Sequence, residues 1–138
     1  CEAVLCTSDQ QLVLLRRSGA VGTHAGLYNG PSGHPEPKTV GFPTANSWDG
    51  STSEELCAAV RQEIFRSVLD EVVAETGVAP ETLSEPLLMG FMADEALKPD
   101  VLFLVRTSLN SEALKDGISK AQEAWESDRL VFWPMATV

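Results

Sequence analysis

Short apolar runs rich in valine and leucine recur along the chain between polar segments, and runs of this length predict β-strands. Residues 2–7 and 11–16 are two such runs with three polar residues between them, which predicts a β-hairpin. Residues 86–93 and 101–107 predict a second hairpin, and residues 130–133 predict one more strand. The hydrophobic pattern therefore predicts two hairpins and a final strand, which are parts of a β-sheet.

The strongest helical pattern covers residues 53–76, with a serine or threonine within residues 51–53 as N-cap and Gly77 as C-cap. At about 100° per residue, with Glu71 set to zero, the apolar side chains fall between about 20° and 200° on the helical wheel. These side chains are Ile64, Phe65, Val68, Leu69, Val72 and Val73. Glu71 and Glu75 lie at about 0° and 40°. The pattern therefore predicts two acids at the margin of a core-facing stripe.

Two further segments give weaker signals. Residues 18–53 are dominated by Gly, Pro, Ser, Asn and Thr, which predicts a long loop with a short strand near residues 27–29. Residues 111–126 are polar, with only weak helical periodicity. The order of strands, helix and further strands predicts a single α/β domain over residues 1–138. Because the chain begins at Cys1 without a methionine, we expect it to be a fragment of a longer protein.

Composition and charge narrow the functional class. With 43% hydrophobic and 22% charged residues, the chain has the composition of an ordinary globular protein. A net charge of -10 repels phosphate backbones, so nucleic acid is not an expected partner and phosphate chemistry would require a cation. No apolar run reaches the length of a membrane span, so no membrane partner is expected. Three cysteines without metal-ligand spacing or a disulfide framework favour a reducing, intracellular location, the cytoplasm first and the nucleus as the alternative.

Two motifs carry the candidate chemistry. Residues 70–78 read D-E-V-V-A-E-T-G-V, which resembles the second half of the Nudix box, G-x5-E-x7-R-E-U-x-E-E-x-G-U with U a bulky aliphatic residue. Residues 31–37 read P-S-G-H-P-E-P and resemble the P-G-G-x-x-E opening of that box, with Ser32 in place of one glycine. An inserted loop separates the two halves. Asp70 stands where the box has arginine, and Ala74 where it has the first of two adjacent glutamates.

The likeness runs along nearly the whole chain and points to one branch of the Nudix hydrolases, the enzymes that cleave UDP-glucose and UDP-galactose. The segments that share it are L-V-L-L-R-R-S at residues 12–18, L-S-E-P-L-L-M-G at 83–90 and E-A-W-E-S at 123–127. The resemblance implies a Nudix fold, an α/β/α sandwich with a mixed β-sheet and the long helix of residues 53–76. It also implies Mg²⁺-dependent hydrolysis of a small-molecule nucleotide sugar to UMP and hexose 1-phosphate.

The glutamate spacing suits a magnesium ion, because Mg²⁺ prefers hard oxygen ligands and retains several waters. Glu71 and Glu75, on adjacent turns of the helix, are therefore predicted as catalytic metal ligands. A divalent ion neutralises a pyrophosphate and lowers the pKa of the attacking water, and Mn²⁺ is the alternative ion. Glu63 lies on the same helix but about 12 Å from Glu71 along its axis. We expect Glu63 to tie down the inserted loop or to hold a second ion.

The resemblance further suggests site residues outside the helix. The backbone carbonyl of Ser32 or Gly33 is a predicted metal ligand, since a small residue permits close approach of the chain. Glu36 is predicted to brace the same loop at the substrate-binding site. Glu126 is the predicted additional catalytic acid, and Glu123 is the alternative.

Other residues leave the function open between several hypotheses. Arg16 and Arg17 end the second predicted strand, and Arg16 is predicted to bind a substrate phosphate, although strand-end arginines are usually solvated. His34 is either a general base or a structural loop residue. Ala74 removes a glutamate that commonly binds metal or activates water, and Asp70 removes an arginine that orients a box glutamate. The alternatives are a pyrophosphatase for another nucleoside diphosphate, such as ADP-ribose, and a Nudix-fold domain that binds nucleotide or protein without useful catalysis.

Overall fold

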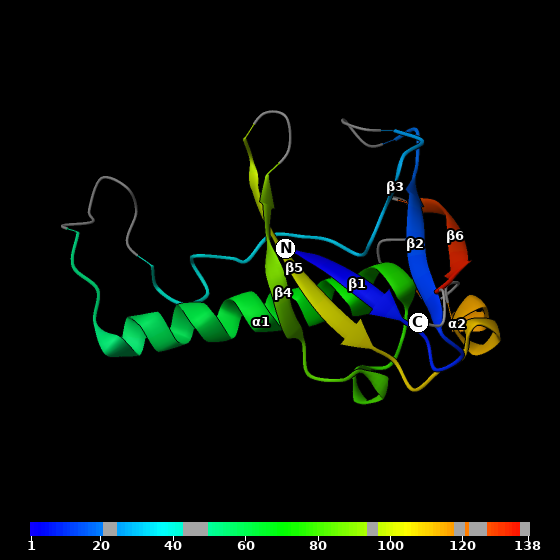
Figure 1. Cartoon of the computed structure of the whole chain (residues 1–138). Helices are drawn as coiled ribbons and strands as arrows, with labels where there is room; N and C mark the ends of the chain where they lie inside the picture. Colours follow the sequence, from blue (N-terminus) through cyan, green and yellow to red (C-terminus); the bar gives the residue numbers. More distant parts are fainter. Residues whose placement is uncertain (21–24, 43–49, 94–96, 118–120, 122–126, 136–138) are drawn as a thin grey trace.

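The computed structural model describes residues 1–20, 25–42, 50–93, 97–117, 121 and 127–135. Three strands precede the long helix, and further strands and a short helix follow it (Figure 1). In chain order the elements are β1 (Glu2–Cys6), β2 (Gln11–Arg17), β3 (Tyr28–Asn29), α1 (Glu54–Thr76), η1 (Pro80–Thr82), β4 (Leu87–Ala93), β5 (Pro99–Arg106), α2 (Ser111–Gly117) and β6 (Ser127–Pro134).

The described strands form one mixed sheet in the order β3-β2-β1-β5-β4, and β6 pairs with β2. β1 and β5 are parallel, with Glu2 opposite Leu102, whereas the other pairs are antiparallel. β6 pairs with β2 from Gln11 to Arg17, so β1 and β3 use the opposite edge of β2 one after the other. The first residues of β1 are therefore not paired with β2, and this part of the β1 edge is available to another segment.

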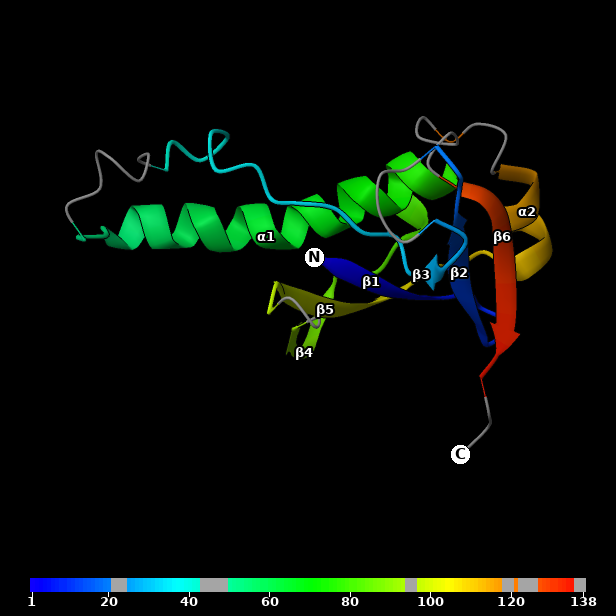
Figure 2. The same ribbon diagram turned by 90° about the horizontal axis from the view of Figure 1, so that it is seen from above.

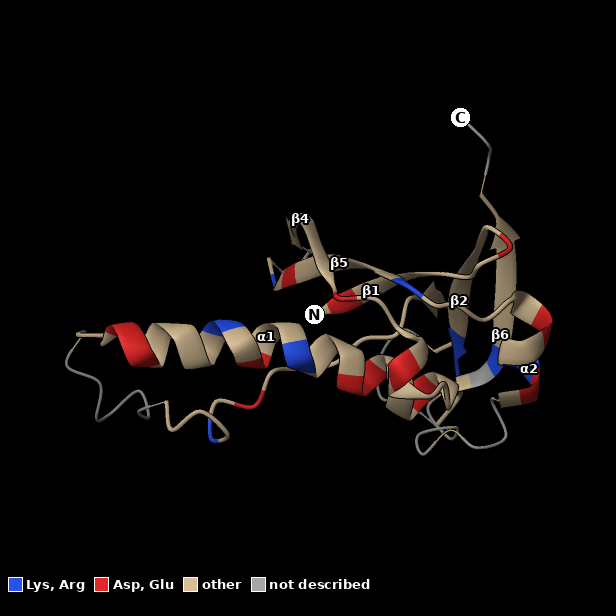
Figure 3. Ribbon diagram, turned by 90° about the horizontal axis from the view of Figure 1, so that it is seen from below, with Lys and Arg blue, Asp and Glu red and all other residues tan. Residues whose placement is uncertain are grey.

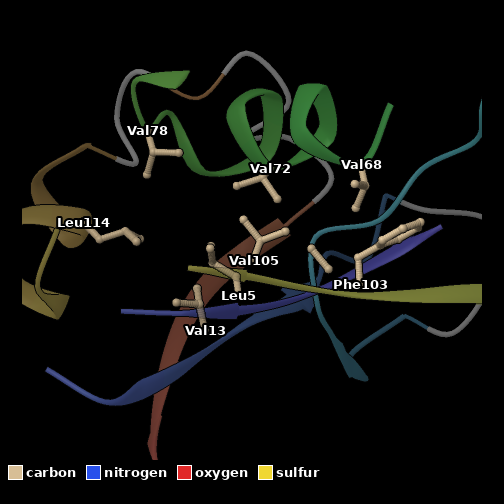
Figure 4. Close-up of a cluster of buried hydrophobic side chains, with 9 residues drawn as sticks. Leu5, Val13, Val68, Val72, Val78, Phe103, Val105 and Leu114 are labelled. Carbon is tan, nitrogen blue, oxygen red and sulfur yellow. The ribbon is translucent and has the colours of Figure 1, made fainter. Parts of the chain in front are cut away.

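The core lies between the sheet and the C-terminal half of α1 (Figures 2 and 4). Alternate residues of β1, β2 and β5 face the helix, as the two-residue period of a strand requires. The buried apolar side chains are Ala3, Leu5, Val13, Phe103 and Val105 from the strands, Val68 and Val72 from α1, Val78 after it, and Leu114 from α2. Phe65 of α1 meets Phe103 edge to face, with ring centroids 4.9 Å apart. This packing fixes α1 above the sheet.

Helix α1 begins and ends at the predicted caps. The Ser53 hydroxyl accepts a hydrogen bond of 3.1 Å from the Leu56 N–H. Gly77 adopts a left-handed conformation with φ 71°, and its N–H donates to the Val73 carbonyl at 2.9 Å. No helix in the described part of the chain, α1 included, combines the length and the apolarity that crossing a membrane requires.

Most predicted elements are confirmed, but several boundaries differ, and the final strand predicted over residues 130–133 runs from Ser127 to Pro134. The hairpins are β1–β2 and β4–β5, and the mixed sheet with its helices confirms the predicted α/β class. The prediction placed Pro99 in the polar connection, but β5 begins there, because the first position of a strand tolerates a residue without an N–H. The weak helical signal of residues 111–126 corresponds to α2, which ends at Gly117. Residues 118–120 and 122–126 lie outside the described residues.

Candidate functional site

The loop after β3 is fastened to the free edge of β1 and then meets α1. The Ala3 N–H donates to the Pro31 carbonyl at 2.8 Å. Cys1 and Gly33 exchange backbone hydrogen bonds, of 2.7 Å from the Cys1 nitrogen and 3.0 Å from the Gly33 nitrogen. This pairing occupies the part of β1 that β2 leaves, and it fixes the path of the loop beneath the helix.

Gly33 approaches Glu71 so closely that a side chain at this position would displace the Glu71 carboxylate. A Cβ atom on Gly33 would overlap the carboxylate of Glu71. The preceding residue, Ser32, donates its backbone N–H to the Glu75 carboxylate at 2.9 Å. Two carboxylates on adjacent turns of α1 therefore meet two consecutive residues of the loop. The glycine is required here for close approach of the backbone to the acid.

The two acids differ in burial. Glu75 is buried, with an exposed fraction of 4%, whereas Glu71 is half-buried. The prediction of two acids at the margin of the apolar stripe therefore describes Glu71, while Glu75 lies deeper, on the helix face that also carries Val68 and Val72. Burying an ionised carboxylate is costly unless hydrogen bonds or a cation compensate it. A cation between the two acids would reduce that cost.

The donor chemistry at this position fits a hard divalent cation. Two carboxylates and the Gly33 carbonyl are oxygen ligands of the kind that Mg²⁺ prefers. The Gly33 carbonyl already accepts a hydrogen bond from the Cys1 nitrogen, so its second lone pair would serve the ion. Among the described residues, no group of three His, Cys, Asp or Glu side chains is arranged to hold a metal. Two protein carboxylates are adequate for Mg²⁺, because it keeps several waters in its shell.

A pocket of about 580 Å³ opens beside Glu71. This volume lies within the range of small-molecule sites, about 300 to 1,000 Å³. Its walls come from the ends of β2 and β3, the loop after β3, α1 and the start of β5. The residues of the walls are Cys1, Arg17, Leu27, Tyr28, Asn29, Ser32, Gly33, His34, Glu36, Glu71, Lys98, Pro99 and Asp100. The pocket therefore joins acids, two cations and exposed apolar side chains around one of the candidate metal ligands.

Charges are distributed unevenly around this region. Figure 3 shows acidic residues gathered along the C-terminal half of α1 and basic residues on β2. Arg17 reaches the pocket from β2 and Lys98 from the residue before β5, while Glu36, Glu71 and Asp100 supply its negative charge. A chain of net charge -10 thus places two cations in the wall of the same pocket as the candidate metal ligands. Such a mixture suits a phosphate-containing ligand held together with a cation.

The structure brings together most of the predicted site residues. Glu71, Glu75, Ser32 and Gly33 meet at the contact between loop and helix, and Glu36 lies in the pocket wall. The predicted acid Glu126 and its alternative Glu123 lie outside the described residues.

The two strand-end arginines differ in position. Arg17 lines the pocket, whereas Arg16 is not among its wall residues, and the Arg16 guanidinium lies near Gly26.

Two further loop residues have defined positions. His34 lines the pocket. Glu63 accepts a hydrogen bond of 3.1 Å from the Glu36 N–H, which confirms the expectation that it ties down the loop. The N-terminal part of α1 is thereby connected to the same loop that meets Glu71 and Glu75 further along the helix.

Sequence reasoning missed several residues of the pocket wall, among them Lys98, Tyr28 and Asn29. Lys98 lies in a segment without hydrophobic periodicity, and Tyr28 and Asn29 lie in the short strand predicted near residues 27–29. The Asn29 amide donates to the Ser32 hydroxyl at 2.9 Å, and its buried Oδ1 atom has no hydrogen-bond partner among the described residues. The aromatic residue in this short strand was the available signal, but the sequence did not indicate that Tyr28 would reach the site.

Comparison with known proteins identifies relatives by sequence. Nudix hydrolase 9 of Arabidopsis thaliana is 38% identical over 130 residues, which is 93% of this chain and 42% of that protein. Uridine diphosphate glucose pyrophosphatase NUDT22 of Bos taurus is 41% identical over 133 residues, which is 94% of this chain and 44% of that protein. The chain therefore spans less than half the length of the curated relatives it matches. No protein-family model matches the chain.

A solved structure is similar in fold. The crystal structure of Shewanella oneidensis NrtR aligns with a TM-score of 0.50 at 19% sequence identity, covering 96% of this chain and 50% of that chain. At this level of identity the likeness concerns the fold alone.

Proposed function

Since this chain is a homologue of Nudix hydrolases over almost its whole length, we propose that it hydrolyses the pyrophosphate of UDP-sugars with Mg²⁺. The products are UMP and a hexose 1-phosphate. The observation that carries the proposal is the contact of Ser32 and Gly33 with Glu75 and Glu71, because it gathers oxygen ligands beside a pocket of nucleotide size. The name of the Bos taurus relative, uridine diphosphate glucose pyrophosphatase NUDT22, supports uridine diphosphate glucose as the substrate.

In the proposed reaction, water attacks one phosphorus atom of the pyrophosphate and the bond from that phosphorus to the bridging oxygen breaks. Glu71 and Glu75 would hold the ion, with the Gly33 carbonyl as a further ligand. The ion, when bound, neutralises the phosphate oxygens and lowers the pKa of the attacking water. The Ser32 N–H orients the Glu75 carboxylate through its 2.9 Å hydrogen bond. Arg17 and Lys98 supply positive charge for the phosphates from the pocket wall.

The test is release of UMP from UDP-glucose with Mg²⁺, comparing the wild-type chain with Glu71→Gln and Glu75→Gln. Removing either ligand charge is expected to lower kcat/KM by on the order of 100-fold, because metal binding is lost or misdirected. Glu81→Gln, in η1 and outside the pocket wall, is the matched control and should retain wild-type activity. Circular dichroism checks that Glu75→Gln is folded. Unchanged activity in both folded variants would refute the proposed ligands.

Gly33→Ala gives a second test that leaves both carboxylates intact. The added methyl group overlaps the Glu71 side chain, so the Glu71 carboxylate must leave its position or the loop must shift, and activity is expected to fall by on the order of 100-fold. Gly19→Ala is the control, because a Cβ at Gly19 meets nothing within 4 Å. Equal activity of the two variants would show that the close approach of Gly33 to Glu71 has no role in turnover.

A second candidate function follows from Ala74. Because the box usually has a glutamate there, the site can hold a nucleotide with its ion and still turn over poorly. That binding function predicts a rise in thermal stability with Mg²⁺ and UDP-glucose together, since a ligand that binds the native state stabilises it. The same samples should then release no UMP. UMP release by the wild-type chain, lost in Glu75→Gln, decides for the hydrolase.

A further inference from the structure

Two arms of the sheet flank the pocket beside Glu71. One arm is the end of β2 with β3, and the other is the β4–β5 hairpin, and Figure 1 shows them rising from the sheet on either side of β1. The wall residues Tyr28 and Lys98 belong to different arms. A ligand in the pocket is therefore contacted from two sides, by side chains of different chemistry.

The β3 arm presents an aromatic surface. Tyr28 is 49% exposed and Leu27 is 57% exposed, although both are large and both line the pocket. Their backbone is held, because the Arg17 N–H donates to the Leu27 carbonyl at 2.9 Å and Tyr28 pairs with Arg16 across the strands. An exposed aromatic side chain on a fixed backbone in a pocket wall is suited to stacking on a planar ligand group such as a nucleobase.

The same arm is connected to the candidate metal ligands. Asn29, next to Tyr28, donates its amide to the Ser32 hydroxyl at 2.9 Å. The Ser32 backbone N–H in turn donates to Glu75 at 2.9 Å. The aromatic surface and the carboxylates are therefore positioned relative to one another by one short chain of hydrogen bonds. This connection suits a ligand that has a base and a phosphate in a fixed relation.

The opposite arm presents a cation. Lys98 immediately precedes Pro99 at the start of β5 and lines the pocket across from β3. The wall also includes Glu36, Glu71 and Asp100, so a phosphate entering it meets repulsion unless cations compensate. A lysine ammonium is a compact charge that binds phosphate oxygens without requiring a particular orientation.

We infer that Tyr28 stacks on the nucleobase and that Lys98 binds the phosphate of the nucleotide, so that the two arms set the orientation of the substrate. This inference takes the nucleotide from the proposed function and assigns its two ends to the two arms. Tyr28 is then a specificity residue for the base, whereas Lys98 recognises any phosphate of suitable size. The two assignments can be separated, because a sugar phosphate without a base does not use Tyr28.

The test for the base contact is isothermal titration of UMP and of ribose 5-phosphate, each with Mg²⁺. Tyr28→Ala is expected to weaken UMP binding about tenfold, because it removes the aromatic side chain on which the base stacks. Its affinity for ribose 5-phosphate should remain within about twofold of wild type, because that ligand has no base to stack. Tyr28→Phe should bind UMP like the wild type. Trp133→Ala is the matched control, an aromatic residue that is 64% exposed on β6 and outside the pocket wall.

The test for the phosphate contact uses Lys98→Gln with the same two ligands. Binding of UMP and of ribose 5-phosphate should weaken by a similar factor of about threefold to tenfold, and both losses should shrink at high salt. Lys38→Gln is the matched control, because it removes the same charge from an exposed lysine outside the pocket wall. Equal losses of ligand affinity in Lys98→Gln and Lys38→Gln would show that the effect comes from the net charge of the protein, and would overturn the assignment of Lys98.

The remaining outcomes separate this inference from the proposed function. Equal weakening of both ligands by Tyr28→Ala, or no weakening, overturns the stacking role of Tyr28. Failure of the wild-type chain to bind UMP at millimolar concentration overturns the whole inference. If the wild type binds UMP in the Tyr28-dependent manner but releases none from UDP-glucose, the two-arm inference stands and the hydrolase proposal fails. If it turns over UDP-glucose with a KM that Tyr28→Ala does not change, the inference fails alone.

Discussion

The two halves of α1 have the same kind of sequence but different surroundings. Residues 54–66 contain no buried side chain, whereas residues 67–76 contain Ser67, Val68, Val72, Glu75 and Thr76, all buried. Figures 1 and 2 show the first half extending past the sheet, with the loop of residues 35–42 beside it. The candidate metal ligands lie only in the half that packs on the sheet.

This difference indicates where rigidity is needed. Glu71 and Glu75 have a fixed position because Val68 and Val72, one turn away, are enclosed by the core. Along the first half, Val60 instead lines two apolar hollows of about 310 and 300 Å³ between the helix and the neighbouring loop. A metal site tolerates only small displacements of its ligands, so it belongs on the better-packed half.

The largest difference in stability is expected when the same substitution, valine to alanine, is made in each half of α1. Val72→Ala should lower the free energy of unfolding by about 2 kcal/mol, because two methyl groups leave a closed core. Val60→Ala, the same change at a half-buried position, should lower it by less than about 1 kcal/mol. Urea denaturation of both variants measures the difference. Equal losses would contradict the view that the second half contributes more to the core than the first.

The two ends of the helix provide a smaller contrast. Gly77 has φ 71°, a conformation in which a Cβ is strained, so Gly77→Ala should cost about 1 kcal/mol of stability. Ser53→Ala removes the hydrogen bond to the Leu56 N–H and should cost about 0.5 kcal/mol, since that end lies away from the core. Thermal melts compare both with Gly19→Ala, where an added Cβ meets open space. A larger loss for Ser53→Ala would reverse the proposed ranking of the two ends.

The smallest effect is expected at α2, whose start is tied to the β1–β2 turn rather than enclosed. Hydrogen bonds from the side chains of Thr7 and Ser111 lower the pKa of Asp9 below its ordinary value of 3.8. A carboxyl group whose pKa is lower in the folded state stabilises the fold above the unfolded pKa, and this contribution is lost as the pH falls through the folded value. Asp9→Asn should therefore lower Tm slightly at pH 7 and make no difference well below pH 3.8. A constant difference at every pH would exclude ionisation as the cause.

Local elements of this fold could be predicted because their signals lie within short stretches of sequence. The caps of α1, Ser53 and Gly77, lie directly at the two ends of the helix in the sequence. Each hairpin joins two apolar runs that are neighbours along the chain. The parallel pairing of β1 with β5 has no such local signal, because neither apolar run indicates that it will pair with a strand so distant in the sequence. The same limit applies to the loop at Ser32 and Gly33, whose contact with α1 was implied by family resemblance and not by periodicity.

The candidate site was predicted in part for the same reason. Glu71 and Glu75 share a helix, so their spacing defines their proximity without knowledge of the fold. The sequence does not indicate which of the adjacent residues Arg16 and Arg17 lines the pocket, because that depends on the position of β2 relative to the loop and the helix. Lys98 becomes a site residue only when β5 is placed beside β1, which is a consequence of long-range pairing.

That parallel pairing also sets an order of assembly. A hairpin such as β1–β2 closes within about 1 to 10 μs, because its strands are neighbours in sequence. β1 joins β5 only after the intervening loop, helix and hairpin have been synthesised and arranged, and contacts of such separation slow folding. On a ribosome, therefore, the first strand emerges long before its central partner. We expect the nascent β1–β2 hairpin to form while the edge of β1 that will bind β5 is still unpaired. The pocket is then completed only after the last third of the chain has been synthesised.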